Sequence, residues 1–175
     1  MQKVSILLSL LVINILLVSF NFPNKAKVHW LSIADMQLAY KKEPKPILVD
    51  VYTSWCGWCK VMDKQTYGKE KVANYINEHY YAVRLDAESK DEIEWNGKKY
   101  GFNTMYKSNQ LAIDLLYAQM SFPTTVLLPS LDGSPAPFAG YLTAKEIEAP
   151  LRFFAENFYK STMFPKYLNK FKGSW

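Results

Sequence analysis

Short apolar runs, each bounded by proline or polar residues, predict the strands of this chain. Residues 47–52, 81–85 and 124–128 are rich in β-branched and other apolar side chains, as buried strands are. A fourth strand is expected over 138–141, after an Asp-Gly turn. Asp50 is the anomaly in the first run, because a carboxylate in a buried strand costs free energy unless something compensates it.

Helical periodicity alternates with these strands. Apolar residues recur at helical spacing in four places: 33–40, 56–62 and beyond, 70–80 and 111–120. Ser32 is placed to cap the first of these helices, and Pro44 follows its end. The alternation of strands and helices predicts an α/β fold.

The last predicted helix begins at a capping box made by Thr143 and Glu146 and runs through Phe158. Pro150 lies inside this pattern and is expected to kink or split the helix. Residues 160–175 then form a tail of lysine and aromatic residues. We expect a mainly solvated tail with a few packed aromatics, and contact with anionic lipid or with a partner is the alternative.

The amino-terminal segment has the character of an export signal. Residues 4–20 form an almost uninterrupted apolar run behind Lys3. The run is short for a membrane span and long for the apolar part of a cleaved signal peptide, so a cleaved leader and an uncleaved anchor both fit. A buried core helix fits less well, because such helices usually carry a polar face. Either fate of the leader places the rest of the chain outside the cytoplasm.

Composition limits the function classes that remain. The chain has 175 residues, of which 49% are hydrophobic and 21% charged, so a globular core is expected and disorder is excluded. The predicted organisation is a signal peptide or signal anchor over 1–26, one domain over 27–159 and the basic, aromatic tail over 160–175. A net charge of +5 spread along the chain gives no nucleic-acid signature.

The candidate chemistry lies in the sequence Cys56-Gly57-Trp58-Cys59. Two cysteines at this spacing, at the amino end of a helix, can close a small disulfide, and the helix terminus lowers the pKa of the first thiol. Cys56 is therefore expected to be the attacking thiolate. Cys59, one turn on and more buried, is expected to resolve the mixed disulfide that Cys56 forms with a substrate.

Other uses of this cysteine pair fit less well. A zinc site would need two more ligands, and the histidines, His29 and His79, do not stand at ligand spacing from each other. Haem attachment would need a histidine where the chain has Lys60. We expect redox chemistry without a metal or another cofactor.

The run ILVDVYTSWCGWCK, residues 47–60, resembles the active-site strand and helix of the thioredoxin family. The resemblance extends from about Trp30 to Phe158 and implies a thioredoxin-like fold, with a central mixed β-sheet flanked by helices. In that family a buried carboxylate lies six residues before the first cysteine, which is the position of Asp50 here. The resemblance implies that Asp50 takes the proton from Cys59; a strand residue facing the surface is the alternative.

A second stretch also resembles the thioredoxin family. Ser121-Phe122-Pro123-Thr124 is similar to the segment that carries the family's cis-proline opposite the cysteines, which implies that substrate backbone pairs beside Pro123. With Trp55, Trp58 and Phe122 it would form an apolar substrate-binding rim. An ordinary proline at the start of a strand is the alternative.

The chain also departs from that family in two places. Residues 88–108 form an insertion before the helix that precedes the cis-proline, and Asn96-Gly97 within it predicts a two-residue hairpin turn. Such an insertion suggests a specialised partner surface. Trp58 stands where thioredoxins have proline, and the dipeptide between the cysteines helps set the reduction potential, so the potential of thioredoxins does not carry over. Asp50 and the absence of a histidine between the cysteines favour a reductase over strongly oxidising or isomerase-type members.

These features most resemble the extracytoplasmic thioredoxin-like thiol-disulfide oxidoreductases of bacteria. The resemblance implies a periplasmic or otherwise extracytoplasmic enzyme, secreted or tethered by its leader. Its partners would be disulfide-containing exported proteins and an upstream thiol reductant, membrane-bound or not. Nucleic acid is not an expected partner, and the membrane is one only through an uncleaved leader. The alternative is a polypeptide-binding module that keeps its cysteines as a structural disulfide.

Overall fold

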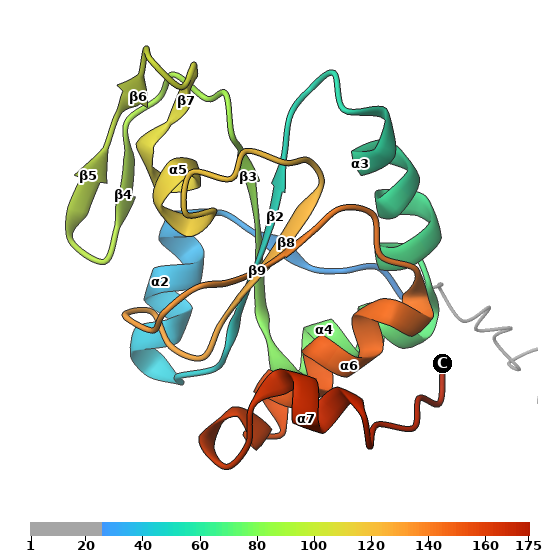
Figure 1. Cartoon of the computed structure of the whole chain (residues 1–175). Coiled ribbons are helices and arrows are strands. Elements are labelled where there is room, and N and C mark those ends of the chain that lie inside the picture. Colours follow the sequence, from blue (N-terminus) through green and yellow to red (C-terminus); the bar gives the residue numbers. More distant parts are fainter. Residues whose placement is uncertain (1–25) are drawn as a thin grey trace, which may run out of the picture.

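A five-stranded mixed sheet forms the centre of the computed structural model, which describes residues 26–175 (Figure 1). Its strands follow the order β1 (Trp30–Leu31), β3 (Tyr81–Asp86), β2 (Ile47–Tyr52), β8 (Thr124–Leu128) and β9 (Ala136–Ala139). The first three are parallel, and β8 and β9 each run antiparallel to their neighbour. The predicted mixed sheet is confirmed. The predicted leader lies outside the described residues except for Ala26.

Helices cover both faces of this sheet, as Figure 1 shows. One face carries α2 (Ile33–Lys42) and α5 (Gln110–Leu115), and the other carries α3 (Gly57–Met62), the π-helical turn η1 (Asp63–Tyr67), α4 (Glu70–His79) and α6 (Ala144–Ala155). Side chains alternate along β2, so that Val49 and Val51 enter the core with α2 and α5, whereas Leu48 enters the core on the α4 and α6 side. Asp50 has the same parity as Leu48 and therefore faces the α3 side.

The predicted helix caps are present. The Ser32 side chain accepts a hydrogen bond from the Asp35 backbone N–H at 3.0 Å, which satisfies one of the free donors at the start of α2. Thr143 and Glu146 form the reciprocal capping box of α6. These local signals fix where both helices begin.

Two predicted boundaries were wrong because the backbone turns earlier than periodicity suggests. The expected helix over 111–120 stops at Leu115, since Tyr117 and Ala118 adopt left-handed φ angles of 50° and 61°. The expected strand over 138–141 is β9, two residues earlier. It ends before Gly140, whose φ of 90° suits glycine and whose N–H donates to the Pro123 carbonyl.

The expected split at Pro150 does not occur. α6 continues through this buried proline and ends at Ala155, before Asn157 adopts a left-handed φ of 61°. Proline removes the hydrogen bond to the carbonyl of Glu146, and Glu146 is exposed to solvent. The apolar face of α6, including Ile147 and Leu151, stays in the core, which offsets the missing bond.

The insertion is an integral part of the fold. The predicted hairpin forms as β4 (Ile93–Trp95) and β5 (Lys98–Tyr100), with Asn96 and Gly97 at positive φ. A second short pair, β6 (Phe102–Asn103) and β7 (Ser108–Asn109), was not predicted. Trp95 is buried, and the Asn109 side-chain amide donates to the backbone carbonyls of Asp91 and Tyr100.

The C-terminal tail combines exposed lysines with packed aromatics, and it also forms elements that were not predicted: η2 (Phe158–Lys160) and α7 (Phe164–Leu168). Phe164 and Tyr167 both lie 5.2 Å from Phe153 of α6 between ring centroids. Figure 1 shows α7 beside α6. Among residues 26–175, no helix combines the length and the apolar character needed to cross a membrane.

Candidate active site

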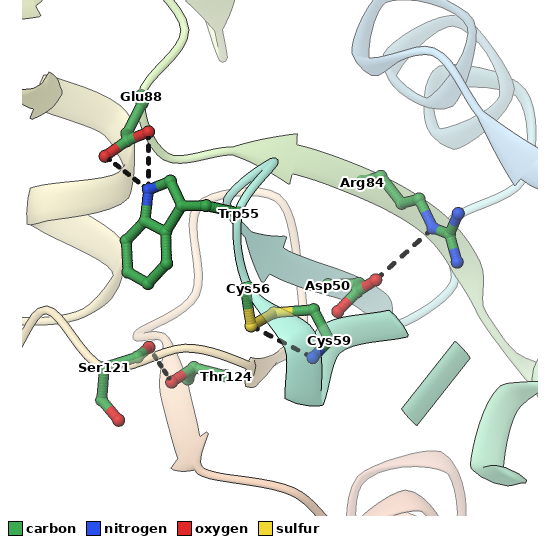
Figure 2. The surroundings of a disulfide bond; sticks show 8 residues. All are labelled: Asp50, Trp55, Cys56, Cys59, Arg84, Glu88, Ser121 and Thr124. Atoms are coloured by element: carbon green, nitrogen blue, oxygen red, sulfur yellow. Dashed lines mark hydrogen bonds and ion pairs between the residues drawn. A yellow bond between two sulfur atoms is a disulfide. The ribbon is translucent and has the colours of Figure 1, made fainter. Parts of the chain in front are cut away.

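Cys56 and Cys59 form a disulfide at the amino end of α3 (Figure 2). Their Cα atoms lie 5.3 Å apart, within the range that a disulfide spans. Cys56 is the N-cap residue: its sulfur accepts a hydrogen bond from the Cys59 backbone N–H at 3.1 Å. This N–H, together with the positive end of the α3 helix dipole, would favour a thiolate on Cys56 in the reduced protein.

The two cysteines differ in exposure in the opposite sense to the expectation. Cys56 is only 4% exposed, whereas Cys59 is partly buried, so the prediction that Cys59 is the more buried was wrong for the disulfide form. The reason is local. Cys56 lies at the inner end of the loop after β2, where its N–H donates to the Thr53 carbonyl, and Cys59 lies one turn out along the helix between two less buried residues.

Asp50 is buried beneath this helix, as the resemblance implied. The residue is 6% exposed, and burial raises the pKa of its carboxyl to about 7, against a lowering by the Arg84 charge and a smaller raising by Asp63. Arg84 Nε lies 3.4 Å from Asp50 Oδ2 without forming a hydrogen bond. The carboxyl is therefore poised to gain or lose a proton near neutral pH.

Arg84 is held in place from several sides. It is the register partner of Asp50 on β3, its guanidinium donates to Asp63 of η1, and it lies 4.4 Å from the ring centroid of Trp30. Sequence reasoning missed Arg84 and Asp63. A charged residue inside the predicted strand 81–85 was the available signal for Arg84, but its pairing with Asp50 depends on the register of β2 and β3.

A cavity of about 140 Å³ joins the carboxyl to the disulfide. Asp50 and Cys59 both line it, together with Thr53, Arg84 and Asp63. Figure 2 shows Asp50 projecting from β2 towards α3 near Cys59. The space is large enough for water, and its lining is polar enough to hold it. The structure thus brings together the carboxyl and the outer sulfur, which lie nine positions apart in the sequence.

Aromatic side chains border the disulfide. Trp55 and Trp58 are 65% and 62% exposed, and the Trp55 ring stands edge-on to Phe122 at 6.2 Å between centroids. The Phe122–Pro123 peptide bond is cis, as the resemblance implied, and Pro123 is buried. Trp55 and Trp58 thus belong to the disulfide segment itself, and Phe122 and Pro123 reach it through the contact between Phe122 and Trp55.

Two further residues of this rim were missed. Glu88 accepts the indole N–H of Trp55 on both carboxylate oxygens at 3.0 Å, which ties Trp55 to the start of the insertion (Figure 2). Tyr141 packs against Trp58 with ring centroids 5.5 Å apart. Both contacts join segments far apart in the sequence, so no local pattern marks them. Within residues 26–175, no cluster of three or more His, Cys, Asp or Glu side chains is arranged to hold a metal ion.

Comparison with known proteins gives a family match over most of the chain. Residues 21–155 match the family model Thioredox_DsbH, described as "Protein of unknown function, DUF255". Among curated proteins, the thiol:disulfide interchange protein DsbD of Pectobacterium atrosepticum is 25% identical over 127 residues, which are 71% of this chain and 19% of that protein. Spermatogenesis-associated protein 20 of Rattus norvegicus is 33% identical over 54 residues, 31% of this chain and 7% of that protein. The chain thus spans less than a fifth of the length of these curated relatives.

Solved structures agree with the fold. A structure described as DsbH oxidoreductase superposes with a TM-score of 0.54 at 18% identity, covering 79% of this chain and 92% of the other. A thioredoxin-fold protein from Helicobacter pylori superposes with a TM-score of 0.56 at 22% identity, covering 72% and 78%. At these identities the likeness establishes the thioredoxin-like fold.

Proposed function

This chain belongs to the Thioredox_DsbH family of thioredoxin-like proteins, and from that premise we propose that it is an extracytoplasmic thiol-disulfide oxidoreductase. It reduces or exchanges disulfides in partner proteins through Cys56 and Cys59. The observation that carries the proposal is the disulfide at the amino end of α3, which shares a cavity with a buried carboxyl of raised pKa. A relative named as a thiol:disulfide interchange protein supports the reaction class.

The first step joins enzyme and substrate. In the reduced protein, the Cys56 thiolate attacks one sulfur of a substrate disulfide. A bond forms between Cys56 and that sulfur, the substrate S–S bond breaks, and the other substrate sulfur leaves as a thiolate. The Cys59 N–H, which lies 3.1 Å from the Cys56 sulfur in the disulfide form, is placed to stabilise the attacking thiolate.

The second step releases the substrate. The Cys59 thiol gives its proton to Asp50, directly or through water in the shared cavity, and its thiolate attacks the Cys56 sulfur. The mixed disulfide breaks, the second substrate sulfur leaves as a thiolate, and the Cys56–Cys59 disulfide forms. Two electrons have then passed to the substrate. An upstream thiol reductant restores the dithiol by the same exchange in the opposite sense.

The rim supplies the substrate contacts in this proposal. Trp55, Trp58 and Phe122 offer apolar surface to an extended polypeptide, beside the segment that ends at Pro123. Disulfide-containing exported proteins are the proposed substrates, because the apolar run over 4–20 is typical of an export signal.

Cysteine variants test this mechanism. Cys56→Ser should abolish turnover of a protein disulfide, whereas Cys59→Ser should still react once and accumulate mixed disulfides with its substrates, visible on non-reducing gels and by mass spectrometry. Trp58→Ala is the matched rim variant: it should raise KM and leave single-turnover chemistry at Cys56 intact. Full turnover by Cys56→Ser would contradict the proposal.

The direction of the reaction is set by the reduction potential of the cysteine pair. We propose the reductase direction, so equilibration against thiol buffers should give a value near −270 mV, about that of thioredoxin. A reduction potential of about −120 mV, typical of strong oxidants, would instead make the protein a donor of disulfides.

A binding module is the second candidate, favoured by the two tryptophans that stay more than 60% exposed beside the disulfide. Replacement of both cysteines by serine separates the two functions. A binding module would keep its partner affinity in that variant, whereas the proposed enzyme would keep only weak, non-covalent contact with its substrates.

A further inference from the structure

The C-terminal segment carries the most one-sided charge of the described chain. Residues 157–175 contain four lysines and no aspartate or glutamate. Met163 and Leu168 lie among these lysines in sequence and are 77% and 49% exposed. Lysines interspersed with exposed apolar side chains are the composition of surfaces that lie on anionic membranes.

The fold holds this segment in a fixed conformation. The Phe164 and Tyr167 rings pack on Phe153, and the Trp175 ring packs against Tyr75 of α4. Glu148, which is 1% exposed, accepts hydrogen bonds from the Ser174 N–H and hydroxyl and from the Trp175 N–H. The lysines are therefore presented without a further cost of ordering the backbone at the moment of binding.

Three of the lysines border one hollow. Lys166, Lys170 and Lys172 line a depression of about 610 Å³, whose wall includes the Tyr167 and Phe171 rings and the Ser161 hydroxyl. Arg152 also lines this hollow, as do its ion-pair partners Glu148 and Glu156. Arg152 offsets one of the two glutamate charges, and the three lysines outweigh the other, so the lining keeps an excess of positive charge. Ammonium groups beside hydroxyls and aromatic rings fit a phosphate headgroup and the glycerol region below it.

The segment also lies near the point where the apolar leader joins the described chain. Ala26 lines a surface depression with Lys64 and Gly68 at the end of η1. Three residues further, Lys71 at the start of α4 donates to the Ser174 carbonyl. The described chain therefore begins and ends in the same part of the molecule, so a membrane that held the apolar run over 4–20 would be within reach of the end of the C-terminal segment.

We infer that residues 158–172 form a docking surface for an anionic lipid bilayer, with Lys166, Lys170 and Lys172 contacting headgroup phosphates and the exposed Met163, three residues before Lys166, entering the interface. This surface extends the predicted membrane contact beyond the leader. It does not depend on the cysteine chemistry.

Amide hydrogen exchange of the full chain in lipid nanodiscs tests the inference. Discs of neutral phosphatidylcholine are compared with discs in which part of this lipid is replaced by phosphatidylglycerol. We expect exchange over 158–172 to slow about fivefold or more in the anionic discs only, since one lysine near an anionic surface contributes about that factor. High salt should abolish the effect, and the insertion over 88–108 should show none.

Matched lysine variants give the specificity. Lys166→Gln, Lys170→Gln and Lys172→Gln together should remove the protection, whereas the same change at exposed Lys41, Lys42 and Lys90 should retain it. Equal protection in neutral discs, equal loss in both triple variants, or equal protection by soluble glycerol phosphate without discs would each overturn the inference. Disulfide turnover by each variant is measured separately, so failure of bilayer docking is distinguishable from failure of the proposed enzymatic function.

Discussion

Two carboxyl groups are buried on the same side of the sheet, and their surroundings give them opposite acidities. Asp50 is 6% exposed beneath the disulfide, and Glu148 is 1% exposed on α6 beneath the C-terminal segment. Burial raises the pKa of Asp50 to about 7. Burial would also raise the pKa of Glu148, but hydrogen bonds from Ser174, Trp175 and Arg152 outweigh it and hold that pKa below its ordinary value.

The difference lies in the number of hydrogen-bond donors. Arg84 approaches Asp50 at 3.4 Å without a hydrogen bond and donates to Asp63 instead. Glu148 accepts four hydrogen bonds, from the backbone and hydroxyl of Ser174, the Trp175 N–H and Arg152 Nε. Low exposure to solvent thus leaves one carboxyl able to exchange a proton near neutral pH, whereas the other, with its hydrogen-bond donors, stays ionised there and anchors the C-terminal segment.

Removal of the Glu148 charge should give the largest loss of stability. Glu148→Gln keeps the side-chain volume but loses the charged acceptor and leaves Arg152 with Glu156 alone, so we expect a loss of about 3 kcal/mol in the free energy of unfolding. Urea denaturation at pH 7 measures it, and amide exchange over 164–175 should accelerate. An unchanged unfolding midpoint would show that the hydrogen bonds of Glu148 to the C-terminal segment do not stabilise the folded protein.

Removal of the Asp50 carboxyl should mainly slow the chemistry. Asp50→Asn cannot accept the Cys59 proton, so resolution of the mixed disulfide should slow about 100-fold at pH 7. In the wild type, this rate should rise with pH and level off above about pH 7, the pKa of Asp50, because only the ionised carboxyl accepts a proton. Stopped-flow single turnovers measure both. Asp91→Asn, at an exposed position of the insertion, should leave the profile unchanged.

The same Asp50→Asn variant should be more stable than the wild type at high pH. The folded-state pKa of about 7 lies above the ordinary 3.8, so between pH 4 and pH 7 the unfolded chain releases this proton while the folded chain keeps it, and wild-type stability falls as pH rises. The variant escapes this loss. The rise of about 3 in pKa, which already includes the attraction of Arg84, corresponds to a gain of at most about 4 kcal/mol at pH 8. Near pH 4 the gain should vanish. A gain that is independent of pH would contradict the raised pKa.

Loss of a single donor to Glu148 should have the smallest effect. Ser174→Ala removes the hydroxyl hydrogen bond to Glu148 Oε1, which measures 2.7 Å, and retains the backbone donors. We expect a loss of about 1 kcal/mol, measured by urea denaturation at pH 7. Ser134→Ala, at an exposed position between β8 and β9, is the control. A loss as large as that of Glu148→Gln would mean that the four hydrogen bonds act as one cooperative unit.

The sequence predicted the fold wherever a signal is local. The β2 strand, the Ser32 cap, the α6 capping box and the Asn96-Gly97 hairpin depend on side chains a few residues apart, and each was confirmed. Predictions of element ends were wrong where the ends depend on distant contacts. The extent of β9, for example, follows from its pairing with β8, from Leu127 opposite Ala136 to Thr124 opposite Ala139.

The active-site motif and the positions of Asp50 and Pro123 were readable from spacing and family resemblance. The sequence by itself determined that two cysteines stand at the start of a helix, that a carboxylate interrupts a buried strand, and that lysines fill the C-terminal segment. Only the tertiary structure decided which groups face these charges. Strand register brings Arg84 to Asp50, and the return of the chain over α6 brings Ser174 to Glu148. Desolvation raises the pKa of any buried carboxyl. The hydrogen bonds and opposite charges that lower the pKa again depend on which groups the fold places beside that carboxyl, and no local pattern in the sequence specifies them.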